Sequence, residues 1–258
     1  MKAGPPPTLF TANALSAARR VKMRRAPRLA PHPPSRRRLR SGARPVSLVA
    51  QKLRVAAADP AEPCLDRPVV RIRARFGKTW AAPGTGFFIA DWLSSIVTAR
   101  HVVALADGAV PAEVSIRVLA GGRWVELEAV AVAYPSGSVA ADDVAIVRVN
   151  ARCTSELRMA TLDAPVAGQI WGYPLGNEAP RPPAVVPARA RPSEGKVLLD
   201  RQGRIGMSGG PVVAVVGEGP PTAVVGIYLG PSPNGGGRAQ TLAAPSVLAS
   251  MEAAMGCA

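Results

Sequence analysis

From residue 59 onward the chain is a succession of short apolar runs, each ended by a cluster of glycine and proline. "VRIRARF" at 70–76 alternates apolar residues with arginine, a period of two that is typical of a half-buried strand. Clusters such as "PLGNEAPRPP" and "GPSPNGGG" supply the turns between runs. Helical bundles and doubly wound folds need long segments of 3.6-residue period, and these are missing before residue 245. The pattern predicts an all-β protein.

The runs form two groups, one over about 65–150 and one over about 160–243. Roughly twelve short strands in two groups predict two antiparallel six-stranded β-barrels packed side by side. After Pro245 the apolar residues recur at helical spacing, which predicts one C-terminal helix over about 245–255. Residues 59–258 are therefore expected to form one domain.

Charge separates the first 58 residues from the rest. Residues 1–58 hold nearly half of the 32 Lys and Arg and no Asp or Glu, whereas the remaining residues are almost neutral in sum. This N-terminal arm is also rich in proline and has one aromatic residue, Phe10. Because such a segment cannot bury enough apolar surface to fold alone, we expect it to be disordered.

Three interpretations of the arm stay open. An Arg-rich, acid-free leader fits an organellar transit peptide, and "SRRRLRSG" at 35–42 is reminiscent of a twin-arginine export signal. The arm could also be a solvated tail, or sequence upstream of a later start at Met23. Binding to nucleic acid would rest on charge alone, without the interleaved aromatics that stack bases, so no nucleic-acid partner is expected. The sequence contains no run of eighteen uncharged apolar residues, so a membrane-spanning helix is not expected.

The three cysteines are Cys64, Cys153 and Cys257. An odd number at wide spacing argues against a disulfide framework and against a zinc site, although one bridge among them stays possible. No cluster of residues suggests a metal, so neither a metal nor a cofactor is expected.

Two histidines are available for acid–base chemistry. His32 lies in the arm, where no packed site could orient it, and His101 stands in "IVTARHVV" at the end of an expected strand. A general base must therefore be His101, unless this residue is purely structural. "AADDVAIVRV" places Asp142 and Asp143 at the start of an apolar strand, where a carboxylate could orient an imidazole. Acids also commonly begin strands, and alternation does not decide which Asp faces the cleft.

Ser208 stands in "RIGMSGGPVV", among glycines 206, 209 and 210. A serine nucleophile must present its Oγ on a sharp turn, with backbone N–H groups converging on the developing oxyanion. Glycines permit that turn and keep the approach open. His, Asp, Ser is one of the known chain orders for a catalytic triad.

These motifs resemble those of the chymotrypsin/trypsin-like serine proteases. "TARH" is similar to the family's Thr-Ala-x-His, "DVAI" to its Asp-[Ile/Val]-Ala-[Leu/Ile], and "GMSGGP" to its Gly-x-Ser-Gly-Gly-Pro. "GTGFFI", "GYPLG" and "VVGIYLG" also match in type and order, so the resemblance covers about residues 65–250.

The resemblance implies a double β-barrel and a serine endopeptidase that acts on polypeptides through an acyl-enzyme. It makes Ser208 the nucleophile, His101 the general base and Asp143 its orienting partner, since Asp143 directly precedes Val144 and Ala145. The oxyanion hole would be the backbone N–H groups of Gly206 and Ser208.

Two residues differ from the pattern of the digestive proteases and indicate which branch of the family the sequence resembles. Val102 replaces the bridging cysteine of digestive members, and Met207 replaces the aspartate that pairs with a new N-terminus after zymogen cleavage. Activation through that ion pair is not expected, and both changes resemble the bacterial and organellar branch of HtrA/Deg proteases. The few residues after residue 250 leave no room for the PDZ domain usual in that branch.

The substrate pocket is less readable. Gln202 stands where trypsin has its specificity aspartate, so a preference for Arg or Lys is not supported, although Asp200 is close by. Tyr228 and Leu229 are expected to line the pocket and to favour a modest apolar side chain. An alternative interpretation is a pseudoprotease: a catalytically silent binding protein that keeps the fold. A third is a basic arm that binds nucleic acid or an anionic membrane, with the barrels as passenger.

Overall fold

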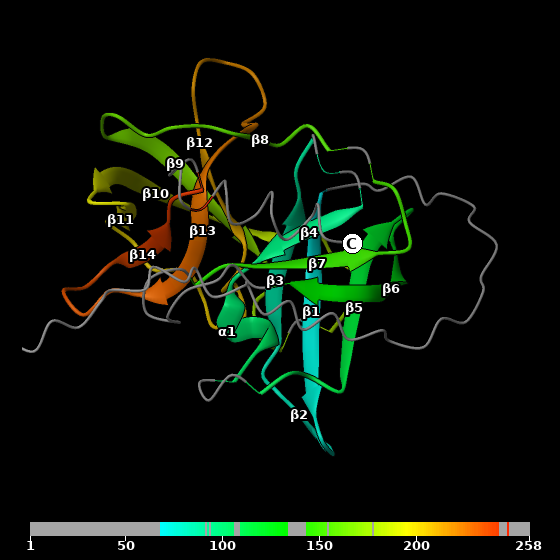
Figure 1. Ribbon diagram of the computed structural model, residues 1–258. Helices are drawn as coiled ribbons and strands as arrows, with labels where there is room; N and C mark the ends of the chain where they lie inside the picture. The colour runs from blue at the N-terminus through cyan, green and yellow to red at the C-terminus, as the bar shows by residue number, and fades with distance from the viewer. Residues whose placement is uncertain are drawn as a thin grey trace, which may run out of the picture. The chain divides into compact units, whose positions relative to one another are not determined.

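The computed structural model describes residues 68–90, 92, 94–105, 109–133, 143–153, 155–176, 178–242 and 247 (Figure 1). The expected arm at 1–58 lies outside the described residues. The same holds for the C-terminal helix expected over 245–255, apart from Val247, which is buried. Of the helices in the described ranges, none is long and apolar enough to cross a bilayer.

Six antiparallel strands close the first barrel in the order β1-β3-β4-β7-β6-β5, with β5 paired back to β1. Along β1 the apolar Val70, Ile72 and Ala74 are fully buried, as the alternation with arginine predicts. The strands are β1 (Val69–Phe76), β3 (Gly84–Phe88), β4 (Ser95–Thr98), β5 (Glu113–Ala120), β6 (Arg123–Ala133) and β7 (Ala145–Val149). A short strand that the sequence pattern did not predict, β2 (Thr79–Trp80), forms a hairpin with β1.

The second barrel has the same design. Its strands follow the order β12-β9-β10-β11-β14-β13, and β13 pairs back to β12. They are β9 (Val166–Gly172), β10 (Ala184–Ser193), β11 (Lys196–Leu199), β12 (Pro211–Ala214), β13 (Ala223–Pro231) and β14 (Gly237–Gln240). A further unpredicted strand, β8 (Arg158–Met159), adds to β13 in parallel. The all-β prediction of two six-stranded barrels is confirmed.

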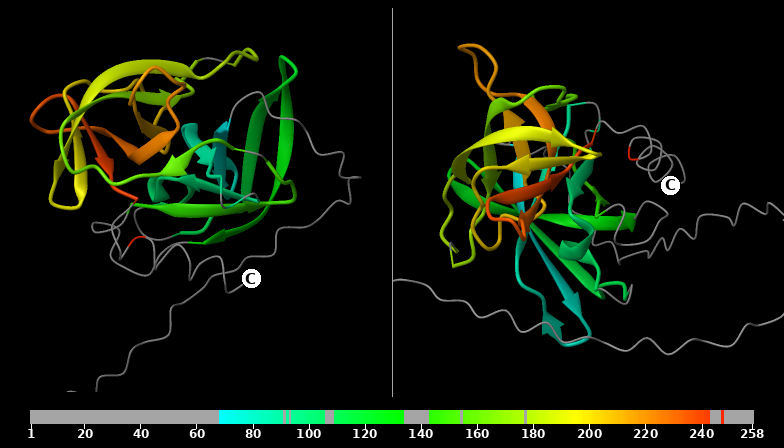
Figure 2. Two further views of the ribbon diagram at one scale, coloured as in Figure 1. Left: turned by 90° about the horizontal axis from the view of Figure 1, so that it is seen from above. Right: turned by 90° about the vertical axis from the view of Figure 1, so that its left-hand side faces the viewer.

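The two barrels share apolar packing. One cluster of buried side chains joins the first barrel's strands to Tyr173, Val213, Val224 and Ile227 of the second, and a second cluster fills the second barrel itself. Figure 2 shows the two groups of strands side by side, cyan and green against yellow and orange. Segments from both barrels therefore meet along this shared border, and the candidate catalytic residues come from such segments.

Candidate active site

His101 lies on a four-residue helix, α1 (Arg100–Val103), which directly follows β4. The sequence pattern placed His101 at the end of a strand. The chain turns into α1 because Val102 and Val103 on its inner side are buried in the first barrel. His101 faces outward, with 40% of its side chain exposed. Its imidazole is thus held on a rigid element and stays accessible from solvent.

Asp143 directly contacts His101. Strand β7 pairs antiparallel with β4, with Ala145 opposite Thr98, so the residues before β7 lie beside those after β4. Asp143 Oδ2 lies 2.7 Å from His101 Nδ1, and Asp143 Oδ1 accepts the backbone N–H of His101 at 2.9 Å. Two bonds from one carboxylate hold both the ring and the backbone of His101. Asp142, the other candidate, lies outside the described residues.

The charged form of Asp143 is favoured. Partial burial acts to raise the pKa of this carboxyl, but the hydrogen bonds and charge of His101, with a smaller contribution from Arg238, outweigh burial and lower the pKa below its usual value. Asp143 is therefore ionised at neutral pH, the state in which it accepts a hydrogen bond from His101 Nδ1.

Ser208 lies on the segment that leads into β12, just after a tight turn. Met207 N–H donates to the Arg204 carbonyl at 3.0 Å, which makes Ile205 and Gly206 the central residues of the turn. Gly206 has φ +94°, and a turn with positive φ at its third residue is the type II turn that favours glycine there. A Cβ on Gly206 would lie 2.6 Å from Leu175 N, so glycine is also required sterically.

The backbone N–H groups of Gly206 and Ser208 point away from the carbonyls of the residues before them, and both of those carbonyls are hydrogen-bonded. The Ile205 carbonyl accepts Leu175 N–H at 2.7 Å, and the Met207 carbonyl accepts Gly210 N–H at 3.0 Å. In a trans peptide the N–H points opposite to the C=O, so the N–H groups of the next residues, Gly206 and Ser208, face the other side. Among the described residues neither of these N–H groups has an acceptor. These two N–H groups are therefore the donors near Ser208 that remain available to an acceptor from outside the described residues.

The turn packs against the residues on either side of His101. A Cβ on Gly209 would collide with the Thr98 hydroxyl and would lie 3.0 Å from Ala99 N. A Cβ on Gly84 would lie 2.5 Å from a methyl of Val102 and 3.1 Å from the Ser208 carbonyl, so only glycine fits between them. The fold thus brings the Ser208 segment of the second barrel against the chain that carries His101.

A family model described as the trypsin-like peptidase domain matches residues 84–227, more than half of the chain. The chain belongs to the trypsin-like peptidases. The matched residues include His101, Asp143 and Ser208, and the resemblance inferred from the motifs is confirmed. The protein is a serine-type peptidase, and polypeptides are its substrate class.

Solved structures agree in fold. The active form of the Rv3671c protease from M. tuberculosis is 22% identical, with a TM-score of 0.52 over 78% of this chain and 93% of that one. The thermostable serine protease AL20 from an extremophilic microorganism is 12% identical, with a TM-score of 0.58 over 74% and 98%. A Glu endopeptidase is 17% identical, with a TM-score of 0.54 over 80% and 96%. Among proteins with curated descriptions, none matches this sequence.

Met207, the departure noted in the sequence, is fully buried in the second barrel of the peptidase. Its sulfur accepts the N–H of Arg204 at 3.3 Å, so the side chain closes the same turn that the backbone closes. Apolar packing occupies the place of the ion pair that is found in zymogen-type relatives.

The expected pocket residues of the peptidase differ in exposure. Gln202 is exposed, Leu229 is half-buried, and Tyr228 is almost fully buried. The Tyr228 hydroxyl accepts Gly203 N–H at 2.8 Å, and Cβ atoms on Gly203 and Gly237 would lie within about 3 Å of its ring. Burial raises the pKa of Tyr228, more than the hydrogen bond from Gly203 lowers it, so the hydroxyl is neutral.

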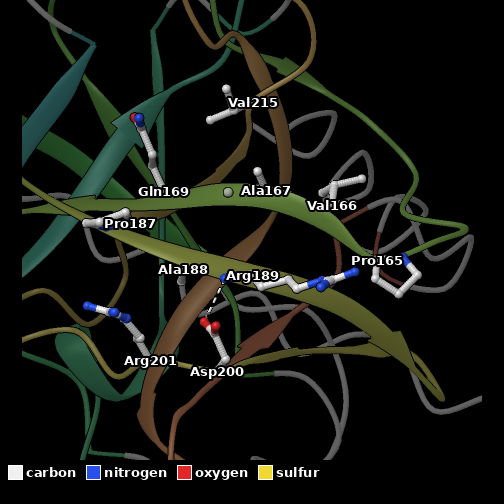
Figure 3. Close-up of a pocket in the computed structure, with 11 residues that line it drawn as sticks. Pro165, Val166, Ala167, Gln169, Pro187, Ala188, Arg189, Asp200, Arg201 and Val215 are labelled. Carbon is white, nitrogen blue, oxygen red and sulfur yellow. Dashed lines mark hydrogen bonds between the residues drawn. The ribbon is translucent and has the colours of Figure 1, made fainter.

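Asp200, the acid near the expected pocket, belongs to a different surface. Its Oδ1 accepts the backbone N–H of Arg189 at 2.6 Å, the dashed line in Figure 3. Both residues line an open groove of about 520 Å³ over β9 and β10, together with Arg201 and Val215. None of the three candidate catalytic residues lines this groove. Asp200 is therefore engaged with the backbone of β10, in a groove that Ser208 does not line.

Sequence reasoning missed the residues that support the Ser208 turn. Thr85 in β3 bonds to the Gly206 carbonyl of the turn although it lies 121 residues away in sequence, and Tyr173 after β9 donates its N–H to the Thr85 hydroxyl. "GTGFFI" and "GYPLG" were singled out as family-like segments, but a motif does not indicate which of its side chains will reach another barrel.

Proposed function

We propose that the chain is an endopeptidase that uses Ser208, His101 and Asp143 as a triad and proceeds through an acyl-enzyme. The observation that carries this proposal is the double hydrogen bond between Asp143 and His101, on a segment packed against the Ser208 turn. The family assignment supports the reaction class. The triad order and the turn motif read from the sequence agree with it.

The mechanism follows from these positions. Ser208 Oγ attacks the peptide carbonyl while His101 Nε2 takes its proton, and the tetrahedral oxyanion is received by the N–H groups of Gly206 and Ser208. His101 then returns the proton to the leaving amine, which leaves an ester on Ser208. Water attacks this ester with the same base, and Ser208 regains its proton as the carboxylic acid leaves. Asp143 stabilises the imidazolium that forms twice in this cycle.

The substrate is proposed to be an extended polypeptide with a small apolar residue before the cleaved bond. Tyr228 supports this, because its backbone bonds to Gly209 and Gly210 beside the nucleophile and its ring packs against Gly203 and Gly237. We infer that the ring limits the depth of the pocket next to Ser208. Ile205 in the turn and Leu175, which donates its N–H to the Ile205 carbonyl, are 76% and 54% exposed. Exposed apolar residues next to the nucleophile turn suit an unfolded, apolar chain.

The decisive experiment is labelling by a fluorophosphonate, which reacts with an activated serine. We expect the full-length protein to be labelled and the Ser208→Ala variant to remain unlabelled. A folded wild-type chain that gives no label would overturn the triad proposal in favour of a pseudoprotease; no feature of the described residues favours that alternative now.

Pocket depth is tested by varying Tyr228. Tyr228→Ala removes this ring, so we expect the kcat/KM ratio for large over small apolar residues before the cleaved bond to rise about tenfold or more. Tyr228→Phe keeps the ring and serves as the matched control, with the wild-type preference retained. A peptide series that varies this one position measures the ratio. An unchanged preference in Tyr228→Ala would show that the ring does not limit the pocket.

A further inference from the structure

Thr85 lies in β3 of the first barrel, yet its hydrogen bonds reach segments of the second barrel that surround Ser208. The residue is fully buried. Its Oγ1 donates to the Gly206 carbonyl at 2.9 Å and accepts the N–H of Tyr173 at 3.0 Å. Its backbone N–H donates to the Ser208 carbonyl at 2.7 Å.

These bonds hold carbonyl groups on both sides of Met207, in the segment that carries the free N–H groups of Gly206 and Ser208. The carbonyls of Ile205, Gly206 and Ser208 are all held, the first by Leu175 and the other two by Thr85. The Gly206–Met207 peptide, whose carbonyl Thr85 Oγ1 holds, lies between the peptide that carries the Gly206 N–H and the peptide that carries the Ser208 N–H. Loss of the bond from Thr85 Oγ1 would free this central peptide to rotate, and the two N–H groups on either side of it could then change direction.

Thr85 is itself held in place. The hydroxyl of Thr98 donates to the Thr85 carbonyl at 2.7 Å. Thr98 is the last residue of β4, the strand that leads into α1 and His101. A Cβ on Gly172 would lie 2.9 Å from Thr85 Oγ1, so the second barrel approaches the hydroxyl closely. Thr85 therefore contacts both β4, the strand that precedes α1, and the turn that precedes Ser208.

We propose that Thr85 is a positioning residue for the oxyanion turn. Its hydroxyl holds the Gly206 carbonyl, so that the N–H groups of Gly206 and Ser208 stay directed at the substrate without an ion pair at Met207. The expected effect on catalysis rests on the proposed function. The expected effect on the conformation of residues 204–210 is independent of it.

Three variants separate the hydroxyl from the shape of the side chain. Thr85→Val keeps the volume but can neither donate to Gly206 nor accept from Tyr173, and Thr85→Ala removes the same bonds without adding a methyl. Thr85→Ser keeps the hydroxyl and is the conservative rescue. Ser155→Ala is the matched control, since the Ser155 hydroxyl donates to the Phe88 carbonyl at the far end of β3, away from the turn.

The first readout is kcat per active site, titrated with a fluorophosphonate. Thr85→Val and Thr85→Ala are expected to lower kcat about 10- to 100-fold with KM changed less than about threefold, because the loss falls on oxyanion stabilisation. Thr85→Ser is expected to stay within about threefold of wild type. Ser155→Ala is expected to lower the melting temperature without lowering kcat per titrated site.

The second readout is hydrogen exchange of residues 204–210, measured in the Ser208→Ala background to prevent self-cleavage. The N–H groups of Met207, Gly209 and Gly210 are bonded within or beside the turn, and their exchange should quicken in Thr85→Val and Thr85→Ala but not in Thr85→Ser. A wild-type chain that is not labelled would refute the proposed function, and this comparison would still decide the role of Thr85.

Either of two results would overturn the proposal. One is wild-type kcat and wild-type exchange in both Thr85→Val and Thr85→Ala. The other is a loss of total activity that equals the loss of titratable active sites, so that kcat per active site is unchanged. Thr85 would then stabilise the fold without positioning the turn.

Discussion

At the scale of single residues, the central feature is a carboxylate that accepts two hydrogen bonds from one partner. Asp143 binds both the Nδ1 and the backbone N–H of His101, and only 19% of its side chain is exposed. This geometry allows one tautomer of His101, with hydrogen on Nδ1 and a free Nε2. A base oriented in this way can accept a proton only from the Nε2 side.

Asp143→Asn tests this orientation. The amide can present N–H to the ring and so stabilise the wrong tautomer, and we expect kcat to fall about 10³- to 10⁴-fold with little change in KM. Steady-state kinetics on a peptide substrate measures the effect. Asp163→Asn, the same change at an exposed position, should leave kcat unaltered. Equal activity in both variants would contradict the assigned role.

The lowered pKa of Asp143 also predicts how stability depends on pH. A carboxyl with a pKa lower in the folded than in the unfolded state stabilises the fold above the unfolded value, and this contribution disappears as pH falls through the folded value. Asp143→Asn should therefore be less stable than the parent near pH 7, and the difference should shrink below about pH 4. Urea unfolding of both chains in the Ser208→Ala background measures it. A difference that grows on acidification would contradict the sign.

At the scale of elements, the nucleophile depends on a turn that needs glycine for two separate reasons. Gly206 has a positive φ, and its missing Cβ leaves room for Leu175 N and the Tyr173 carbonyl. The turn is held from the second barrel by Leu175 and from the first by Thr85. Strand β3 and the segment that follows β9 thus hold the geometry of the turn, although neither is close to it in sequence.

Gly206→Ala and Gly217→Ala separate the two requirements. Both glycines have positive φ, but a Cβ on Gly217 would meet open space. We expect Gly217→Ala to cost about 1 kcal/mol of stability, from backbone strain, without loss of activity. Gly206→Ala should destabilise more and slow fluorophosphonate labelling about 100-fold or more, because the backbone must shift. Thermal unfolding measures the loss of stability, and the rate of fluorophosphonate labelling measures the activity of Ser208. Equal labelling rates in both variants would contradict the steric argument.

At the scale of the whole molecule, the two barrels share one apolar cluster. Ile227 of β13 is fully buried in that cluster together with strands of the first barrel. Barrels that share a core are expected to unfold together, and a site whose residues come from both barrels then disappears in one step.

Ile227→Ala tests the shared core. We expect a loss of about 2–5 kcal/mol in the free energy of unfolding, with one transition retained. Urea unfolding followed by circular dichroism and by tryptophan fluorescence gives the measurement, and Val216→Ala, at a side chain 72% exposed, should stay within about 0.5 kcal/mol of the parent. Two separate transitions would show that the barrels are independent.

The local sequence pattern was enough to predict the barrel strands and the candidate catalytic residues. Period-two alternation and glycine-proline turns predicted the twelve barrel strands, because each signal depends on neighbours in sequence. It missed β2 and β8, which are two residues long and have no periodicity to detect. It also placed His101 on a strand instead of α1, because a single helical turn is set by the burial of Val102 and Val103 and not by propensity.

The sequence by itself determined the all-β class, the resemblance to trypsin-like peptidases, and the presence of one usable histidine, one acidic strand start and one glycine-flanked serine. Only the tertiary structure decided what those residues touch. It joined Asp143 to His101 through the pairing of β7 with β4, bonded the Tyr228 backbone to Gly209 and Gly210 next to Ser208, and brought Thr85 across the border of the barrels to Gly206. Hydrogen bonds between residues distant in sequence leave no periodic pattern in the sequence, because each depends on how strands pair within a barrel or on how the two barrels pack.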